Sequence, residues 1–383
     1  MSSRKIAVFD TTLRDGEQSP GIALQPHEKA ELGRRLERLG VDVIEAGFAA
    51  FSDGDFRGVC AVAREVRNAT VASMCRARRD DVDAAADALA DARRSRLHVV
   101  LGTSPIHMER KLGLEPEEVL ERTSSIVAYA KSRVDEVEFC CEDATRSDPA
   151  FVARVCAAAV AAGADVVNLP DTVGVALPDQ YAAFLRGVRA RCPELARVVV
   201  SAHCHDDLGL AVANTLAAVR AGAGQVEVTV NGIGERAGNA SLEEVVMALR
   251  VHGDELGVHT GVDPAEIGGT SAQVARLTGY DVPRNKAIVG ANAFAHESGI
   301  HQDGLLKDVS TYQFLDPAEL GLEMTLPLGK HSGRHAFARA CAAAGFPLDG
   351  DALAAAFARF KSLADTGRPL TLEQLFAKEV VPT

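Results

Sequence analysis

The first strand-like segment of this chain ends in Phe9-Asp10-Thr11-Thr12-Leu13-Arg14-Asp15-Gly16-Glu17-Gln18, so that an apolar run leads directly to an arginine and a carboxylate. A doubly wound α/β sheet usually carries a glycine-rich, phosphate-binding turn at this place, after its first strand. Because the sequence has Thr-Leu-Arg-Asp there instead, it favours the other common arrangement of alternating strands and helices, a (β/α)8 barrel.

Apolar strand-like runs and Ala-rich helical stretches alternate from here to about Leu249. Eight such repeats in roughly 250 residues are typical of a closed parallel barrel. The predicted strands are Ile6–Phe9, Val41–Ala46, Thr70–Met74, Leu97–Leu101, Glu136–Cys140, Asp165–Leu169, Val198–Ala202 and Gln225–Val230. The predicted helices include Pro26–Leu39, Asp81–Arg93, Pro116–Lys131, Pro149–Ala162, Pro178–Arg191, Leu210–Ala221 and Val262–Leu277. We expect a TIM-barrel domain over residues 1–275 and small, mostly helical C-terminal subdomains over residues 276–383.

The composition is that of an ordinary globular protein, with 47% hydrophobic and 25% charged residues. A net charge of −12 argues against nucleic-acid binding, which needs a basic face. No apolar run approaches the ~20 residues that span a bilayer, and the first residues lack a signal-peptide core, so we expect no membrane partner. The eight cysteines do not form a disulfide framework in a chain this long, which favours a cytoplasmic protein with free thiols.

Polar side chains gather where the predicted strands end, which is where barrel enzymes place their active sites. These residues are Arg14, Asp15 and Gln18 after the first strand, Glu45 at the end of the second, His107 after the fourth, Glu142 after the fifth, Asn168 at the end of the sixth and Thr172 after it, His203 and His205 after the seventh, and Asn239 after the eighth.

Two of these positions predict a metal site. In Ser201-Ala202-His203-Cys204-His205-Asp206-Asp207 the two imidazoles are two residues apart, so on a strand they face the same way. Two nitrogens and the Asp15 carboxylate suit a divalent cation with open positions for substrate. Arg14, beside that cation, can stabilise a developing negative charge. The two histidines alone could be ordinary strand-end residues, and it is their combination with Arg14-Asp15 and Asn239 that favours a metal centre.

Long stretches of the sequence also carry a family resemblance. They are Asp10–Pro20, Gly40–Gly47, Thr103–Leu112, Glu138–Arg146, Pro170–Gly174, His203–Thr215, Asn231–Leu249, Asn285–Lys307 and Leu328–Arg334, with Tyr312. In these stretches the sequence resembles the 2-isopropylmalate synthases, within the metal-dependent acyl-CoA condensing barrels that include homocitrate and citramalate synthases. The resemblance covers about residues 5 to 360.

The resemblance implies a role for each candidate residue. It makes Asp15, His203 and His205 the metal ligands, with a further oxygen from Asn239. It makes Arg14 the residue that stabilises the enolate or the bound oxo acid, and it gives proton transfer to Glu142, His301 and Tyr312. It assigns the substrate carboxylate to Thr172 and the rest of the substrate pocket to Gln18, Glu45, His107, Cys140 and Asn168. In this family His301 and Tyr312 reach the barrel mouth of the partner subunit, which implies a homodimer.

The implied reaction is the condensation of acetyl-CoA with a 2-oxo acid, followed by hydrolysis of the thioester. A 2-oxo acid can chelate a cation through its keto and carboxylate oxygens, which polarises the keto group. This chemistry favours Mg²⁺ or Mn²⁺, although two imidazoles are also compatible with Zn²⁺. A carboxylate or a histidine can remove the proton from the acetyl methyl group, and the sequence does not decide which of the two is the base.

The identity of the 2-oxo acid substrate is the least determined part of the predicted function. The resemblance favours 2-oxoisovalerate, giving 2-isopropylmalate, but Cys140 and Val175 depart from the residues usual in this family. The alternatives are a homocitrate-, citramalate- or phosphonomethylmalate-synthase-like reaction on another 2-oxo acid, a carbon–carbon lyase acting on a hydroxyacyl-CoA, and a barrel without activity. Family members typically continue into a leucine-binding domain; because this sequence ends at Thr383, we expect no feedback control by leucine.

Overall fold

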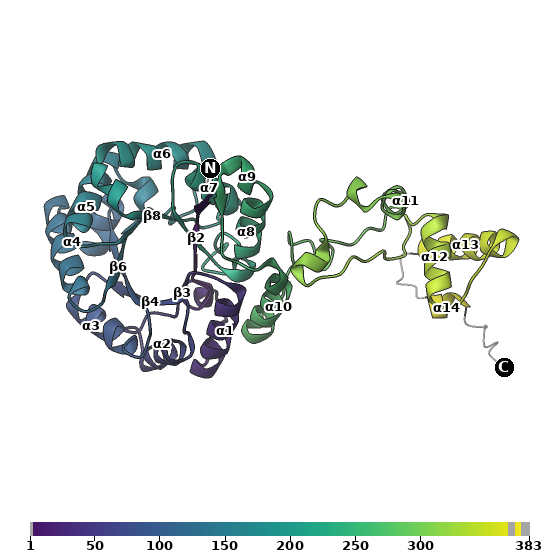
Figure 1. Ribbon diagram of the computed structural model, residues 1–383, viewed down its shortest axis with the longest axis horizontal. Coiled ribbons are helices and arrows are strands. Elements are labelled where there is room, and N and C mark those ends of the chain that lie inside the picture. Colours follow the sequence, from purple (N-terminus) through teal and green to yellow (C-terminus); the bar gives the residue numbers. More distant parts are fainter. Residues whose placement is uncertain (1–2, 367–371, 377–383) are drawn as a thin grey trace. The chain divides into compact units, whose positions relative to one another are not determined.

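Eight parallel strands close into a barrel in the N-terminal part of the computed structural model (Figure 1). Each strand pairs with the next along the chain, and β2 pairs with β9 to close the ring. The strands are β2 (Ala7–Asp10), β3 (Val43–Glu45), β4 (Thr70–Arg76), β5 (Ser95–Gly102), β6 (Glu136–Glu142), β7 (Val166–Asn168), β8 (Val199–His203) and β9 (Gln225–Val228). The predicted TIM barrel is confirmed.

The structure describes residues 3–366 and 372–376, which divide into two compact units, 1–282 and 283–383. The barrel and its helices make up the first unit. No helix in the described ranges is long and apolar enough to cross a membrane.

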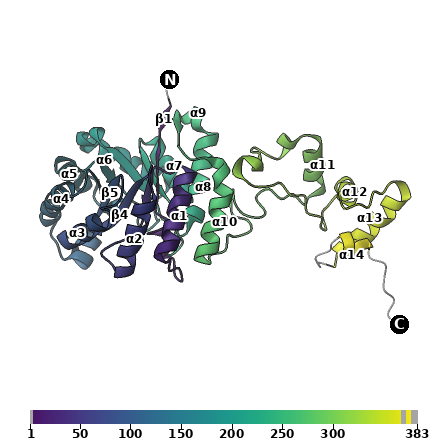
Figure 2. The same ribbon diagram turned by 60° about the horizontal axis from the view of Figure 1, so that its bottom comes forward.

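Helices cover the outside of the barrel, one after most strands (Figure 2). They are α1 (Pro26–Leu39), α2 (Asp53–Glu65), α3 (Arg79–Ala88), α4 (Pro116–Lys131), α5 (Pro149–Ala161), α6 (Pro178–Arg191), α7 (Ala211–Arg220) and α8 (Leu242–Val251), followed by α9 (Gly253–Leu256) and α10 (Ile267–Thr278). Helices α1, α4, α5 and α6 begin on a proline, as predicted. Proline is favoured there because its missing N–H has no partner in the first helical turn and its φ suits a helix.

Two predicted helices differ from the structure. Helix α3 begins at Arg79 and ends at Ala88, five residues before the predicted end, and the chain then turns into β5. The predicted helix Val262–Leu277 starts later, as a 3-10 turn over Pro264–Glu266 that leads into α10. Its start is set by Asp263, whose side chain accepts a hydrogen bond from the N–H of Ala265 and caps this turn.

A short second sheet lies beside the barrel. Strand β1 (Arg4–Lys5) pairs in parallel with β10 (Val258–His259), so the chain segments before the first barrel strand and after α9 are joined. Shorter turns of 3-10 or π-helix occupy Gly16–Gln18, His107–Leu112, Ala144–Arg146, Pro193–Arg197 and Val230–Gly232.

Ion pairs fill part of the barrel interior. Arg96 of β5 donates hydrogen bonds to Glu138 of β6 and to Gln225 of β9, both at 2.8 Å. Since β5 and β9 are not neighbours in the ring, these side chains meet inside it. Phe9 of β2 lies edge-on to His98 of β5, with ring centres 5.6 Å apart. The interior is therefore polar well below the strand ends where the sequence placed the site.

The second unit is mostly helical, as predicted. Its helices are α11 (Gly299–Lys307), α12 (Arg334–Ala343), α13 (Gly350–Ala364) and α14 (Leu372–Phe376), with 3-10 turns at Val309–Thr311 and Pro317–Leu320. Phe337, Cys341 and Phe360 form the centre of a small apolar core between α12 and α13. Gly345-Phe346-Pro347 lies in the connection between these two helices.

Candidate metal centre and active site

Two strand ends bring Asp15, His203 and His205 together. The carboxylate oxygens of Asp15 lie 3.4 Å from Nε2 of His205 and 3.8 Å from Nε2 of His203. The two Nε2 atoms are themselves 3.4 Å apart. All three side chains are buried. Side chains separated by about 190 residues in sequence thus form one compact cluster of possible metal ligands.

The other ring nitrogen of His205 is hydrogen-bonded to the protein, and that of His203 lies near a buried carboxylate. Nδ1 of His205 donates a hydrogen bond to the carbonyl oxygen of Thr172. A carbonyl can only accept, so the hydrogen is on Nδ1 and the lone pair of Nε2 is free for a cation. Nδ1 of His203 lies 3.1 Å from a carboxylate oxygen of Glu227. Burial, and then the nearby His205, lower the pKa of His203 to about 3, which keeps its ring neutral and able to bind a metal.

Asn239 completes this cluster from the loop after β9. Its Nδ2 donates to Asp15 at 2.9 Å and to the carbonyl oxygen of Ile233 at 3.1 Å. Its Oδ1 is buried and has no hydrogen-bond partner among the described residues. An unpartnered buried oxygen beside two bare imidazole nitrogens and a carboxylate is a donor set that fits a divalent cation. The predicted role of Asn239 as a direct ligand stays a prediction.

The loop that carries Asp15 is anchored by charged side chains. Lys29 of α1 is buried and donates to the carbonyl oxygens of Leu13 and Ala46, at 3.0 and 3.2 Å. It also forms an ion pair with Glu17 at 2.5 Å. These contacts tie the loop after β2 to the end of β3, and so position the two residues that follow Leu13.

Arg14 lies between the metal cluster and a buried acid. Its Nη1 is 2.7 Å from Asp15 and its Nε is 2.7 Å from Glu45. Glu45 also accepts from the hydroxyl of Thr11 at 2.6 Å and lies 2.7 Å from Nδ1 of His98. Burial favours the protonated form of Glu45, but the charges of Arg14 and His98 outweigh it and bring its pKa to about 2. Glu45 therefore stays ionised and holds the guanidinium beside the cluster.

A cavity of about 380 Å³ opens above the metal cluster. Nine of the predicted site residues line it: Arg14, Asp15, Gln18, Cys140, Glu142, Asn168, Thr172, His203 and His205. Its apolar lining consists of Phe48, Met74, Val100, Leu101, Leu112 and Pro170, with Ala77 at the margin. The cavity thus combines a metal-ligand cluster at its base with apolar surface around it.

The comparisons with known proteins agree with this geometry. A family model described as HMGL-like matches residues 5–274, and one described as homocitrate synthase post-HMGL domain-like matches residues 288–368. The chain is 53% identical to the 2-isopropylmalate synthase of Heliobacterium modesticaldum, over 97% of this chain and 73% of that protein. It is 54% identical to that of Pyrococcus furiosus, over 96% of this chain and 74% of the other. The chain belongs to the 2-isopropylmalate synthase family.

Solved structures resemble the barrel of this 2-isopropylmalate synthase family member. The hydroxymethylglutaryl-CoA lyase of Pseudomonas aeruginosa matches 74% of this chain and 96% of its own, with a TM-score of 0.63 and 23% identity. The HMG-CoA lyase of Bacillus subtilis matches 74% of this chain and 97% of its own, with a TM-score of 0.62 and 20% identity. At these identities the likeness concerns the fold.

Two further residues that the family resemblance singled out lie behind the cavity lining. Glu45 is fully buried beneath Arg14, with its oxygens taken up by the contacts above. His107 lies 3.5 Å from Glu142 and 3.7 Å from Asp143. Glu142 itself accepts from Lys111, at 2.6 and 2.8 Å. The structure places Glu45 and His107 next to cavity residues, and their predicted contact with substrate stays a prediction.

His301 and Tyr312 belong to the second unit. His301 is in α11 and Tyr312 follows the 3-10 turn Val309–Thr311. Their rings stack with centres 4.1 Å apart, so the two predicted proton-transfer residues of this family form one pair. Both side chains are exposed.

Sequence reasoning missed several cavity residues. His98 lies in the middle of β5 and Glu227 lies within β9, whereas the predicted site residues lie at the strand ends or beyond them. Alternation along β5 was the available signal: His98, Val100 and Gly102 are two apart, so they share a face, and all three line the cavity.

Proposed function

We propose that this chain catalyses a divalent-metal-dependent condensation of acetyl-CoA with 2-oxoisovalerate, giving 2-isopropylmalate. The acetyl methyl carbon loses a proton and bonds to the keto carbon, whose oxygen gains a proton. Water then cleaves the thioester and releases the free thiol of coenzyme A. The observation that carries this proposal is the buried cluster of Asp15, His203 and His205 beside Arg14, in a member of the 2-isopropylmalate synthase family.

The three clustered side chains would hold the cation. When bound, the cation supplies a Lewis acid that polarises the keto group of a chelating 2-oxo acid. We propose Mg²⁺ or Mn²⁺ as the preferred ion, because the substrate adds hard oxygen donors to the set. Zn²⁺ is the competing choice, since imidazole also suits it.

Arg14 would stabilise the negative charge that develops on the keto oxygen. Its guanidinium is fixed on two sides by Asp15 and Glu45, so it needs little reorganisation during the reaction. Burial disfavours a charged arginine, but the Glu45 and Asp15 carboxylates raise the pKa of Arg14 above its usual value. A permanent positive charge beside the metal cluster is therefore part of the resting site.

Thr172 is suited to bind the substrate carboxylate, and the Oδ1 of Asn168 is suited to accept a hydrogen bond from another group of the substrate or from solvent. The Thr172 hydroxyl oxygen accepts from the backbone N–H of Asp143 at 2.9 Å, which fixes its position. Within the described residues this hydroxyl donates no hydrogen bond, so its proton is available to a ligand. Asn168 is 1% exposed and its Oδ1 has no partner in the described part of the chain, as expected for a residue that waits for substrate or solvent.

The apolar side of the cavity favours an oxo acid with a branched hydrocarbon chain. Met74, Val100 and Leu101 can bury an isopropyl group. Each aliphatic carbon buried in this way stabilises the bound acid by about 0.8 kcal/mol. The apolar side chains offer no charge to the second carboxylate of 2-oxoglutarate, and Arg76 is held by Asp81 at 2.7 and 3.0 Å. Arg78 and Arg122 also line the cavity, and such an acid would have to reach them for its second carboxylate to be paired. Pyruvate also fits, but its methyl group contacts less of the apolar lining than an isopropyl group does. Cys140, which departs from the residue usual in this family, leaves the preferred size of the oxo acid open. A change of one side chain in such a pocket alters the preference between two oxo acids by about 1–3 kcal/mol.

Proton transfer at the acetyl group is proposed for Glu142, His301 and Tyr312. Glu142 lines the cavity, and Lys111 holds its carboxylate in place. We propose that His301 and Tyr312 reach this cavity from a second copy of the chain, so that the active form is a homodimer. Either Glu142 or His301 can be the base that acts on the methyl group.

A panel of 2-oxo acids tests the proposed function. Release of free thiol from acetyl-CoA is measured with 2-oxoisovalerate, pyruvate and 2-oxoglutarate, with Mg²⁺ or Mn²⁺ present. We expect the largest kcat/KM with 2-oxoisovalerate, a smaller one with pyruvate, and thiol release at background with 2-oxoglutarate. Background release with every oxo acid would refute the proposal, and cleavage of a hydroxyacyl-CoA instead would establish the lyase alternative.

A further inference from the structure

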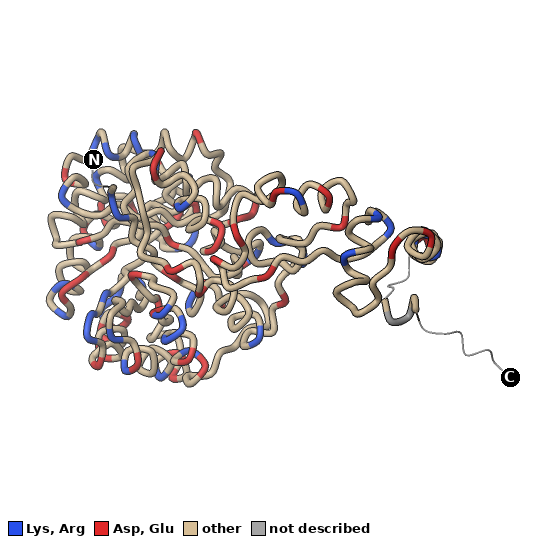
Figure 3. The backbone as a smooth tube through the Cα atoms, turned by 45° about the vertical axis from the view of Figure 1, so that its right-hand side comes forward, with Lys and Arg blue, Asp and Glu red and all other residues tan. Residues whose placement is uncertain are grey.

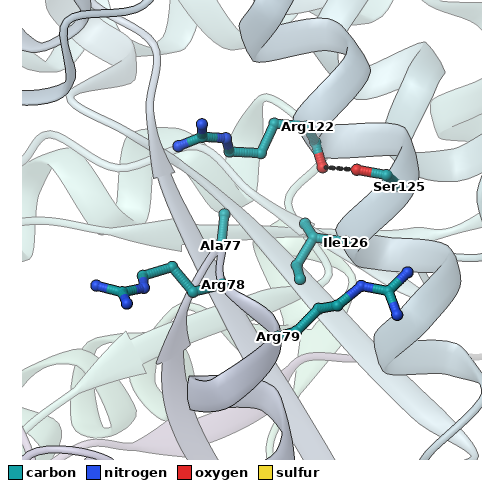
Figure 4. Close-up of a pocket in the computed structure, with 6 residues that line it drawn as sticks. All are labelled: Ala77, Arg78, Arg79, Arg122, Ser125 and Ile126. Atoms are coloured by element: carbon teal, nitrogen blue, oxygen red, sulfur yellow. Dashed lines mark hydrogen bonds between the residues drawn. The ribbon is translucent and has the colours of Figure 1, made fainter.

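A second hollow opens next to the metal cavity, between the end of β4 and helix α4 (Figure 4). It measures about 500 Å³ and is lined by Ala77, Arg78, Arg79, Arg122, Ser125 and Ile126. Ala77, Arg78 and Arg122 line the metal cavity as well. The two spaces therefore adjoin each other, with Ala77, Arg78 and Arg122 at their common border. We call it the arginine groove.

The arginine groove has positive charge without matching carboxylates. Arg78 approaches only the well-exposed Asp80, at 3.9 Å. Arg79 and Arg122 form no ion pair within the described residues, and no acidic side chain lines the groove. The chain as a whole has a net charge of −12, and acidic and basic residues are interspersed along its backbone (Figure 3).

Other cations near the cavity are already neutralised. Arg76 pairs with Asp81, and Lys111 pairs with Glu142. Arg236 pairs with Asp207 through two hydrogen bonds, at 2.7 and 2.9 Å. The contrast separates the arginine groove from its surroundings: these cavity cations have carboxylate partners, whereas Arg79 and Arg122 have none among the described residues.

We infer that the arginine groove binds phosphate groups of coenzyme A, and this inference rests on the proposed function. The thioester of acetyl-CoA must reach the metal cavity, while its diphosphate and ribose 3′-phosphate lie at the other end of the molecule. An anionic end that leaves the cavity past Ala77 meets a hollow lined by three arginines, of which Arg78 and Arg122 extend to one side and Arg79 to the other (Figure 4). Arginine is the side chain best suited to phosphate, because its planar fork can donate two parallel hydrogen bonds.

The position of each arginine fits this assignment. Arg78 and Arg122 extend their guanidinium groups toward the same side, from β4's end and from α4 (Figure 4). Both border the metal cavity, so they would meet the phosphates nearest the pantetheine arm. Arg79 lines only the groove and stacks on Tyr129, with the guanidinium carbon 4.4 Å from the ring centre. That stacking preorganises Arg79 for the outer phosphate.

Direct binding of coenzyme A tests the inference without requiring turnover. Dissociation constants for CoA and for 3′-dephospho-CoA are measured by calorimetry on the full chain. The variants are Arg122→Glu and Arg79→Glu, and the matched control is Arg186→Glu on α6, an exposed arginine away from the groove. We expect each groove variant to weaken CoA binding about tenfold or more, and the control to stay within twofold of the wild type. Thermal unfolding checks that each variant is folded, and Arg122→Glu, with no stacking partner to lose, remains informative if Arg79→Glu is not.

The 3′-dephospho probe separates phosphate recognition from general electrostatics. The wild type should prefer CoA, and at least one groove variant should lose that preference. Unchanged dissociation constants in both groove variants would overturn the inference, as would an equal loss in the Arg186→Glu control. Wild-type protein that binds CoA through the groove but releases no thiol with any oxo acid would refute only the proposed function. Turnover of acetyl-CoA with unaffected groove variants would refute only the groove, and failure of the wild type to bind CoA would refute both.

Discussion

At the scale of single residues, the positions of the hydrogens on the His203 and His205 rings determine whether the cluster can bind a metal. His205 gives its Nδ1 hydrogen to a backbone carbonyl, so the bare Nε2 faces the bare Nε2 of His203 at 3.4 Å. Two lone pairs directed at one point repel unless a proton or a cation lies between them. Burial and His205 make a proton on His203 unfavourable, because they lower its pKa to about 3. Burial disfavours a charged His205, but its hydrogen bond with Asp15 outweighs burial and raises the pKa of His205, so without a cation a proton on its Nε2 can separate the two nitrogens. A divalent cation would replace that proton.

The first prediction concerns the only carboxylate in the metal cluster. Asp15→Asn keeps the size of the side chain but removes its charge, so the cation is held less tightly and is less able to polarise substrate. We expect kcat/KM for condensation to fall by about three orders of magnitude or more, as several kcal/mol of transition-state stabilisation are lost. Steady-state thiol release and Mn²⁺ titration measure the effect. Asp80→Asn, an exposed aspartate, is the control, and full activity in Asp15→Asn would contradict the assignment.

The second prediction concerns Glu45, which contacts Arg14 and lies outside the cavity lining. Glu45→Gln retains a hydrogen-bond acceptor but removes the charge opposite the guanidinium. Partners in this outer position typically contribute 10–100-fold, and we expect kcat/KM to fall by about that amount. Metal affinity should change by less than about threefold, since Glu45 contacts none of the three clustered ligands. Equal losses of metal affinity and activity would show that Glu45 acts on the cluster itself.

At the scale of elements, the sequence predicts the frame well and the barrel interior poorly. Four helices begin at prolines that could be recognised directly, and the strand–helix repeat identifies the barrel. The contacts of Arg96 with Glu138 and Gln225 cross the ring between strands far apart in sequence. Strand periodicity shows which face a residue shares but not which partner it meets across a closed barrel. For the same reason His98, in the middle of β5, was missed, whereas Asp15, beyond β2, and His203, at the end of β8, were found.

The third prediction tests the ion pair inside the barrel. Arg96→Leu leaves the fully buried Glu138 without its charged partner, although Gln225 still donates to it at 2.9 Å. Breaking a buried pair typically costs about 3–5 kcal/mol, and we expect the free energy of unfolding at pH 8 to fall by about that much. Urea titration measures it. The control, Arg94→Leu at an exposed position beside β5, should change stability by less than about 0.5 kcal/mol.

The same variant predicts a pH dependence. Burial, and then the nearby Glu227, raise the pKa of Glu138 to about 7. A carboxyl whose pKa is higher in the folded state stabilises the fold most at pH values below its unfolded pKa. That contribution is lost as the pH rises toward 7. At pH 5 Glu138 is neutral and needs no cation, so Arg96→Leu should cost less than at pH 8. A cost that grows on acidification would contradict this account.

At the scale of the whole molecule, the proposed dimer explains why His301 and Tyr312 form a stacked, exposed pair in the second unit. The paired rings lie outside the barrel unit that carries the metal cluster. The resemblance to 2-isopropylmalate synthases assigned this pair to the active site of a partner subunit. That assignment came from the family alone, because no periodicity or spacing in one chain reveals a contact between two chains.

The fourth prediction tests a shared site by mixing two inactive variants. Asp15→Asn disables the barrel, and His301→Ala disables the second unit. In a hybrid dimer with exchanged second units, one site carries both changes and the other carries neither. Random mixing makes about half of the dimers hybrid, and one of the two sites in each hybrid is intact. The mixture should therefore recover roughly a quarter of the wild-type activity. Each variant alone is the control. No recovery, in a mixture shown by mass measurement to contain hybrid dimers, would contradict the sharing of sites between subunits.

The central claim is that Asp15, His203 and His205 hold the cation on which condensation depends. The most direct test is anomalous diffraction from crystals grown with Mn²⁺ and 2-oxoisovalerate. We predict an anomalous peak among a carboxylate oxygen of Asp15 and the Nε2 atoms of His203 and His205, with the oxo acid's keto and carboxylate oxygens on the same ion. An anomalous peak elsewhere, or a bound oxo acid with no ion among these three side chains, would contradict the account.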